Sequence, residues 1–233
     1  MYICKNFNYM NDFEKFAISN GIGTNKLDGY SKYITKNGYI NPTILEERQL
    51  NVVGIDVFSR LMYDKIIFLG TGIDSDVANI INAQLLYLNS ISDKTDNVKM
   101  FINSGGGSVT DGLSIYDTMN FIDPDISTYC MGMAASMASV LLSSGTKGKR
   151  YALPHGSIMI HQVSSGIGRA QCADIQIMAT ETKKTQDMLY KILSENTGKT
   201  FEEIEHDADR DCWFTSEEAL NYGLIDKIIT KNN

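Results

Sequence analysis

The sequence is poor in the residues that most often bind metals, and it has no long apolar run. Its four cysteines, Cys4, Cys130, Cys172 and Cys212, are widely spaced, with neither a CxxC pair nor a Cys/His spacing typical of a metal site. They indicate reduced, mostly structural thiols, so we expect no cofactor, no bound metal and a cytoplasmic location. No apolar stretch approaches the roughly 20 residues of a membrane-spanning helix, and no secretory signal is predicted at the N-terminus.

Basic residues are also in the minority, because 21 Lys and Arg oppose 28 Asp and Glu, for a formal net charge of -7. This balance disfavours electrostatic binding to nucleic acid or to an anionic membrane. Prolines occur only at positions 42, 124 and 154, which leaves long segments free to form helices and strands. The chain does have 233 residues with 43% hydrophobic side chains, enough for one sizeable domain.

Residues 1–40 and 41–233 differ in pattern. The first forty are rich in Asn, Lys, Tyr and Gly without sustained periodicity, and we interpret them as an N-terminal extension of weak structure. Beyond them, short apolar runs typical of buried strands alternate with helical patterns. The predicted strands are 65–70, 98–103, 126–131 and 157–161, and the helices between them are 76–91 and 109–122. This alternation predicts βαβ units and an α/β fold.

One long amphipathic helix is predicted over 173–198, with Gly198 as its terminator. The residues that fall near one stripe of this helix are Ile175, Met178, Thr182, Thr185, Met188, Leu189 and Ile192. A domain of this size rarely needs so long a helix for its own core. The helix therefore either packs across the body of the domain or projects to make subunit contacts.

The stretch GMAASMASVLLSSG, residues 132–145, contains no charged residue and places Ser136 at the start of an apolar helical pattern. A structural interpretation makes Ser136 the N-cap, whose oxygen accepts a hydrogen bond from an N–H of the first turn. A functional interpretation makes it a nucleophile at the positive end of the helix dipole. The GxSxG elbow of α/β-hydrolases is disfavoured, because Ala134 and Ala138 stand at its two glycine positions.

Acyl transfer also needs a base, and the chain has three histidines. His155 follows a proline in a predicted turn, and His206 lies in the acidic segment EEIEHDADRD, where a solvated helix surface is expected. His161 instead follows the apolar run SIMI, at a strand end. Three consecutive glycines in NSGGGSVTDG, residues 103–112, form either a simple tight turn or a turn that points a backbone N–H into a cleft as an oxyanion donor. No phosphate-binding glycine pattern is present.

Three blocks of the sequence together resemble the proteolytic subunits of the Clp protease family (ClpP). They read INSGGGSVTDGLSIYDTMNFI, CMGMAASMASVLLSSGTKGKRYALPHGSIMIHQ and DADRDCWFTSEEALNYGLIDKII, and the similarity runs through roughly residues 42–230. The resemblance implies a crotonase-like spiral of βαβ units with a long projecting handle helix. It also implies a self-compartmentalised serine endopeptidase that hydrolyses the peptide bonds of unfolded proteins.

The resemblance also implies roles for individual residues. Ser136 matches the family's nucleophile, His161 its base, and Asp211 the acid that orients the histidine. The backbone amides of Gly107 and Met137 would form the oxyanion hole. The triad is dispersed along the chain, so only folding can assemble it.

An assembly is implied as well, in the form of two stacked heptameric rings of identical subunits. The long helix would lie at the contact between the rings, with Asp209 and Arg210 as salt-bridging residues. An AAA+ ATPase unfoldase of the ClpX or ClpA/ClpC kind would supply unfolded polypeptides and dock near Phe101 and Phe121. The extension before Pro42 is expected to be a propeptide, and the expected compartment is a bacterial cytosol or an organelle of bacterial descent.

The sequence departs from the family pattern at three places. Gly105 stands where Pro is usual, Val163-Ser164-Ser165 where Pro-Leu-Gly is common, and Lys99 where the docking surface often has an aromatic residue. Two other functions stay open. The chain could be a non-catalytic ring subunit of a mixed Clp assembly, or a crotonase-like acyl-CoA enzyme that holds a thioester oxyanion with backbone amides.

Overall fold

The computed structural model describes residues 43–48, 51–93, 95–166 and 168–231. Contacts divide the chain into two units, Met1–Arg60 and Leu61–Asn233. In the first unit, β1 (Thr43–Arg48) and β2 (Asn51–Asp56) form an antiparallel pair. The predicted extension, residues 1–40, lies outside the described residues.

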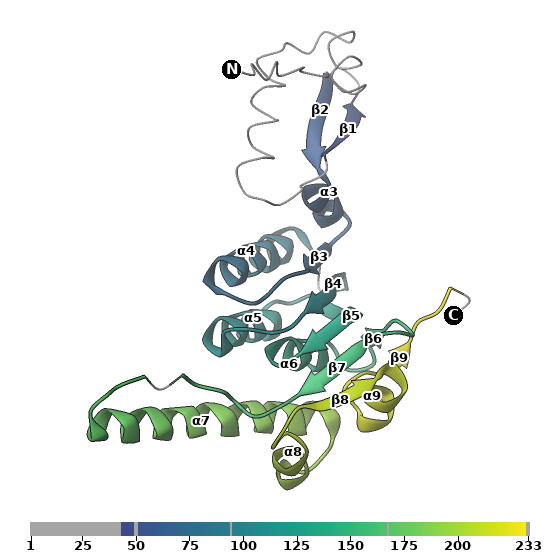
Figure 1. Ribbon diagram of the computed structural model, residues 1–233. Helices are drawn as coiled ribbons and strands as arrows, with labels where there is room; N and C mark the ends of the chain where they lie inside the picture. The colour runs from purple at the N-terminus through teal and green to yellow at the C-terminus, as the bar shows by residue number, and fades with distance from the viewer. Residues whose placement is uncertain (1–42, 49–50, 94, 167, 232–233) are drawn as a thin grey trace, which may run out of the picture. The chain divides into compact units, whose positions relative to one another are not determined.

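The second unit is built on a seven-stranded sheet, in which β7 and β8 are the antiparallel pair and the other pairs are parallel (Figure 1). Along its main path the order is β3 (Ile66–Leu69), β4 (Asn97–Ser104), β5 (Asp125–Ala135), β6 (Arg150–Ala152) and β9 (Lys227–Ile228). The first half of β5 pairs with β6 and its second half with β7 (Ser157–Ile160), which in turn pairs with β8 (Cys212–Thr215). The four predicted strands correspond to β3, β4, β5 and β7, so the α/β prediction is confirmed.

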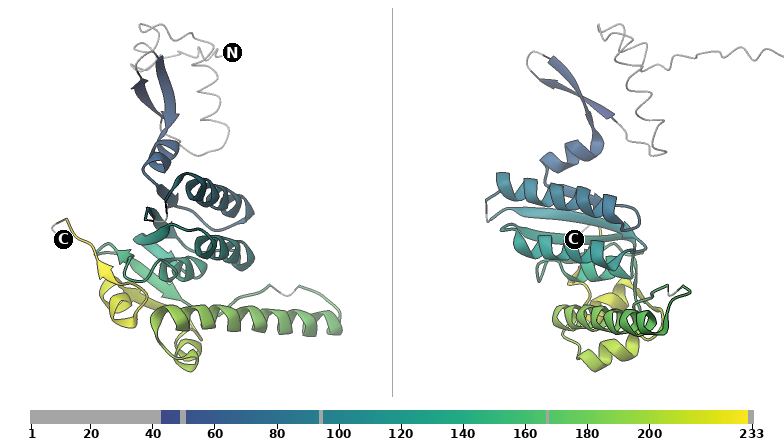
Figure 2. Two further views of the ribbon diagram at one scale, coloured as in Figure 1. Left: turned by 180° about the vertical axis from the view of Figure 1, so that it is seen from behind. Right: turned by 90° about the vertical axis from the view of Figure 1, so that its left-hand side faces the viewer.

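The two predicted helices between these strands are α4 (Ser75–Ile91) and α5 (Val109–Phe121), which lie side by side along the sheet (Figures 1 and 2). Their buried residues recur every three or four positions, as expected for helices that pack one face on a core. These residues are Ala78, Ile81, Leu85 and Leu88 of α4, and Gly112, Ile115 and Met119 of α5. The core therefore lies between the helices and the strands.

Four helices of the described chain, α3, α6, α8 and α9, are short, with seven residues each. α3 (Val57–Tyr63) spans the boundary between the two units. Every residue of α6 (Met137–Ser143) is buried, which explains why its sequence has no charged residue. Both α8 (Phe201–Asp207) and α9 (Ser216–Tyr222) begin with a threonine capping box, in which the threonine and a glutamate satisfy each other's backbone N–H groups.

The long helix is α7 (Cys172–Thr197), ended by Gly198 with a left-handed φ of 80°. The two halves of this helix differ: one projects, and the other packs on the domain. Residues 172–181 are all exposed and extend beyond the rest of the second unit (Figures 1 and 2). Leu189, Tyr190, Ile192 and Leu193 near the other end are buried. Among the described residues, no helix is long and apolar enough to cross a membrane.

Candidate active site

Ser136 lies at the junction between the end of β5 and the start of α6. Its φ of 56° and ψ of -127° are unusual for a residue with a side chain, and such strain is found preferentially at functional sites. Its backbone N–H donates a 2.9 Å hydrogen bond to the carbonyl oxygen of Met159 in β7. The Ser136 side chain makes no capping hydrogen bond, so the interpretation of Ser136 as an N-cap by its side chain is wrong.

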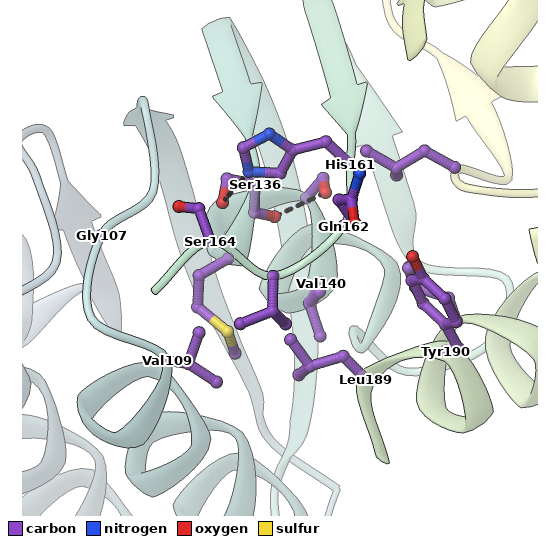
Figure 3. Close-up of a pocket in the computed structure, with 14 residues that line it drawn as sticks. Gly107, Val109, Ser136, Val140, His161, Gln162, Ser164, Leu189 and Tyr190 are labelled. Atoms are coloured by element: carbon purple, nitrogen blue, oxygen red, sulfur yellow. Dashed lines mark hydrogen bonds between the residues drawn. The ribbon is translucent and has the colours of Figure 1, made fainter. Parts of the chain in front are cut away.

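The Ser136 hydroxyl is instead directed at a histidine (Figure 3). The distance from Ser136 Oγ to His161 Nε2 is 2.9 Å, and His161 Nδ1 lies 3.0 Å from Asp211 Oδ1. An ionised carboxylate can only accept, so Nδ1 carries the proton of the neutral ring and Nε2 is left to accept the hydroxyl proton. The three residues therefore form one continuous chain of hydrogen bonds.

The sheet register explains why these residues meet. Ala135 pairs with Met159 in the parallel strands β5 and β7, so Ser136 and His161 leave the sheet at the same edge. The antiparallel pairing of β7 with β8 ends at Ile160 opposite Cys212, which places the next residues, His161 and Asp211, opposite one another. The sequence predictions for this site thus fall on residues that the sheet brings together.

Gln162, the residue after His161, is a site residue that no motif in the sequence had indicated. Its Nε2 donates a 2.6 Å hydrogen bond to the carbonyl oxygen of Asp209. This bond ties the segment that follows β7 to the segment that precedes β8, just beyond the last backbone pair. The only signal in the sequence was its position beside the histidine.

The glycine run lies against Ser136. Gly106 has a φ of 86°, and a Cβ built on it would lie 2.8 Å from the Ser136 Cβ and 2.9 Å from the Met137 nitrogen. Only glycine fits this close approach. Within the described part of the chain, the amides of Gly107 and Met137 donate no hydrogen bond, so both stay available to a ligand. Met137 is the first residue of α6, where the helix dipole favours negative charge.

A pocket opens beside the serine, and its walls combine polar and apolar groups (Figure 3). The residues that line it besides the triad's serine and histidine are Gly107, Val109, Met137, Ser139, Val140, Ile160, Gln162, Val163, Ser164, Leu189, Tyr190 and Leu193. Val163 and Ser164, at one of the departures from the family pattern, thus contribute to the pocket. Among residues 43–48, 51–93, 95–166 and 168–231, no group of three or more His, Cys, Asp or Glu is placed to hold a metal ion.

Four other predicted residues do not line this pocket. Asp209 and Arg210 are exposed, and Arg210 Nη1 donates a 2.7 Å hydrogen bond to the Asp209 carbonyl oxygen. Phe101 of β4 stacks on Tyr129 of β5, with ring centroids 4.6 Å apart. Phe121, at the end of α5, is 75% exposed.

Comparison with known proteins identifies the family. The family model described as Clp protease matches residues 49–232. The chain belongs to the Clp protease family. The resemblance and the crotonase-like fold class expected from the sequence are confirmed by this match.

The two other histidines also lie where the sequence predicts, His155 in a turn and His206 on the exposed surface of α8.

Relatives of the Clp protease family cover nearly the whole chain. An ATP-dependent Clp protease proteolytic subunit of Porphyromonas gingivalis is 54% identical over 96% of this chain and 99% of its own length. A subunit of the same name from Bacteroides fragilis is 52% identical over 95% of this chain and all of its own length. One from Corynebacterium glutamicum, named proteolytic subunit 2, is 52% identical over 76% of this chain and 87% of its own length.

Proposed function

We propose that Ser136, His161 and Asp211 are the catalytic triad of this Clp-type serine endopeptidase, and that the amides of Gly107 and Met137 form its oxyanion hole. The endopeptidase activity itself follows from family membership. The observation that supports the residue roles most directly is the pair of hydrogen bonds, 2.9 Å and 3.0 Å long, that joins serine, histidine and aspartate. An acyl-CoA enzyme would not need this set, and a non-catalytic subunit would have no use for it.

In the proposed reaction, His161 Nε2 takes the Ser136 hydroxyl proton while Oγ forms a bond to the carbonyl carbon of the substrate. The carbonyl oxygen becomes an oxyanion and accepts hydrogen bonds from the Gly107 and Met137 amides. The imidazolium then gives its proton to the leaving amine as the peptide bond breaks. Water repeats the sequence on the acyl-enzyme, releasing the acid and restoring the serine. Asp211 holds the Nδ1 proton in place and stabilises the imidazolium.

Two of the described cysteines, Cys130 and Cys212, are poor nucleophiles and do not compete for this role. Burial raises the pKa of the Cys130 thiol to about 12 and also raises the pKa of Cys212 above its ordinary value. These thiols therefore stay protonated near neutral pH, whereas a nucleophilic cysteine needs its thiolate. All three described cysteines are free, which supports a cytoplasmic location as part of the proposal, since cytosolic thiols are kept reduced.

The test is labelling with a fluorophosphonate, followed by peptide mapping of the modified residue. We expect the label on Ser136, lost in Ser136→Ala and in heat-unfolded protein and strongly slowed in His161→Ala. Peptide hydrolysis should fall about 10⁴-fold or more in Ser136→Ala. The matched control is His155→Ala, an exposed histidine in a turn, which should label at the wild-type rate. A label on another serine, or full peptidase activity in Ser136→Ala, would refute the assignment.

Family membership implies an ATP-dependent Clp assembly. We propose that its form is two stacked heptameric rings of this chain, with α7, Asp209 and Arg210 at the contact between rings. The exposed first half of α7 supports this, because its apolar residues Ile175 and Ile177 are 39% and 60% exposed. Sedimentation should give a mass of many subunits for the wild type and a smaller one for Arg210→Glu. A monomer that retains peptidase activity would contradict the assembly.

We also propose that an AAA+ unfoldase docks at Phe101 and Phe121. The 75% exposure of Phe121 is compatible with this, because its ring is accessible to a partner. In Phe121→Ala, hydrolysis of a short peptide should be unchanged while ATP-dependent degradation of a folded protein falls. Leu220→Ala, which shortens an exposed apolar side chain on α9, is the control. If Phe121→Ala and Leu220→Ala degraded the folded protein at the same rate, the docking site would not include Phe121.

A further inference from the structure

Ser104, the last residue of β4, carries a buried hydroxyl that faces the glycine run. The residue is 3% exposed, and its Oγ accepts a 3.1 Å hydrogen bond from the N–H of Gly106. Buried polar groups of this kind are costly unless they are paired, so the bond fixes both partners. The hydroxyl thus holds the peptide unit that joins Gly105 to Gly106.

Two further hydrogen bonds hold the same turn to Ile73. The Ile73 N–H donates to the Gly106 carbonyl oxygen at 2.9 Å, and the Ser108 N–H donates to the Ile73 carbonyl oxygen at 2.8 Å. The Gly106 carbonyl and the Gly107 N–H belong to one planar trans peptide, so they point in opposite directions. Anchoring the carbonyl on Ile73 therefore turns the Gly107 N–H away from Ile73.

The turn needs these anchors because three glycines give it little stiffness of its own. Glycine populates many backbone conformations, and Gly106 and Gly107 have φ values of 86° and 153°, outside the range that other residues favour. Gly105 has no such φ, and a Cβ there would meet nothing within 4 Å. At Gly105, therefore, no side chain or ring restricts the backbone.

We propose that Ser104 is a positioning residue for the oxyanion hole, which it sets by holding the Gly106 amide and through it the direction of the Gly107 N–H. The inference rests on the proposed function of Gly107. It assigns to a side-chain hydroxyl the restraint that a stiffer residue at position 105 would supply. Ser104 does not line the pocket, so its effect should appear only when negative charge develops on the carbonyl oxygen.

The test compares Ser104→Ala with Ser127→Ala in the assembled enzyme. Ser127 of β5 is equally buried, at 2% exposed, and its hydroxyl donates to Asn97 Oδ1 at 3.0 Å, away from the glycine run. Each change removes a hydrogen bond made by the hydroxyl of a buried strand serine. Each variant is assayed for kcat and KM on a short fluorogenic peptide, for inhibition by a peptide boronic acid, and for its thermal midpoint.

We expect kcat of Ser104→Ala to fall about tenfold or more, since losing one oxyanion donor outright costs about 100-fold to 1000-fold. KM should change less than about twofold, because ground-state binding is untouched. The boronic acid forms a tetrahedral adduct with Ser136 that resembles the transition state, so its inhibition constant should rise in proportion to the fall in kcat. Ser127→Ala should keep the wild-type kcat, KM and inhibition constant.

Rescue distinguishes positioning from general damage. Adding Gly105→Pro to Ser104→Ala should recover much of the lost kcat, because proline fixes φ and favours the extended backbone that Ser104 already has. If Ser104→Ala does not assemble, Ser104→Cys, whose thiol fills the site but accepts only weakly, is measured instead with the same expectation. Wild-type kcat and inhibition in the Ser104 variant, or equal losses in both serine variants, would overturn the proposal. An inactive wild type would instead count against the proposed triad.

Discussion

The buried ion pair between Arg150 and Asp226 gives a quantitative test of what holds the second unit together. Arg150 is 2% exposed, and its guanidinium donates to both oxygens of Asp226, at 2.7 and 2.9 Å. It also donates to the carbonyl oxygens of Ser143, at the end of α6, and Asn196, near the end of α7. The pair therefore joins two helices to the strand β6 and to the segment before β9.

The perturbation is Asp226→Asn, which keeps the shape of the side chain and removes its charge. Two backbone N–H groups, of Gly148 and Arg150, also donate to the Asp226 carboxylate. The NH₂ group of an asparagine side chain at position 226 is a donor itself, so it could not accept the hydrogen bonds that a carboxylate oxygen accepts. Leaving one charge of a buried pair uncompensated costs about 3–5 kcal/mol. We expect the free energy of unfolding to fall by that amount, with a clear drop in the thermal midpoint.

The matched control is Asp125→Asn. Asp125 Oδ2 lies 2.8 Å from Lys149 Nζ, a similar distance, but the two side chains are 48% and 36% exposed. Solvent screens such pairs, and breaking one costs about 0–1 kcal/mol. Urea and thermal unfolding of both variants, followed by circular dichroism, measure the difference. Equal losses in the two variants would show that burial does not set the strength of the Arg150 pair and would refute the reasoning.

The pH dependence of the same comparison follows from the pKa of Asp226. Burial alone would raise this pKa, but the hydrogen bonds from Arg150 outweigh it, so the pKa lies below its ordinary value. A carboxyl with a lowered folded-state pKa contributes stability above its unfolded pKa, about 3.9, and loses it as the pH falls through the folded value. The difference between wild type and Asp226→Asn should therefore be constant near neutral pH and shrink below about pH 4.

Two further predictions use neighbouring residues as their own controls. Gly106→Ala should lower kcat by about 100-fold or more, because the new Cβ would press on the Ser136 Cβ at 2.8 Å. Its control is Gly105→Ala, which should change kcat less than about twofold, because a Cβ at that position would meet nothing within 4 Å. Equal kcat in the two alanine variants would contradict the close approach. Leu189→Ala should lower the free energy of unfolding by about 2–5 kcal/mol, because Leu189 is only 7% exposed. Met188→Ala should lower it by under about 0.5 kcal/mol, because Met188 is 51% exposed. Chemical denaturation checks this pair, and a larger loss for Met188 would reverse our account of α7.

The parts of the fold that the sequence predicted are those with strong periodic signals. The strands β3, β4, β5 and β7 and the helix α7 were found within a few residues of their observed ends. The strands β6 (RYA), β8 (CWFT) and β9 (KI) were not predicted. They lack the continuous apolar runs of the equally short strands β3 (IIFL) and β7 (SIMI), and they exist through pairing with distant strands. The local residue pattern of a strand contains no information about which distant strand will pair with it.

The candidate site was reached through the family resemblance more than through local pattern. The apolar stretch around Ser136 left a capping role and a catalytic role open, and only the folded geometry separates them. The positive φ of Ser136 depends on the turn from β5 into α6, and the bond from Gln162 to the Asp209 carbonyl crosses 47 residues. Sequence spacing alone cannot reveal contacts of this kind.

The chain order of the three residues determines what a shortened chain could contain. Ser136 and His161 follow β5 and β7, whereas Asp211 precedes β8 and comes after α7 and α8 in the chain. A fragment that ended before Asp211 would keep the serine and the histidine but lack the carboxylate that orients the imidazole in the proposed triad. A cut within α8 would therefore separate the proposed nucleophile and base from their third partner.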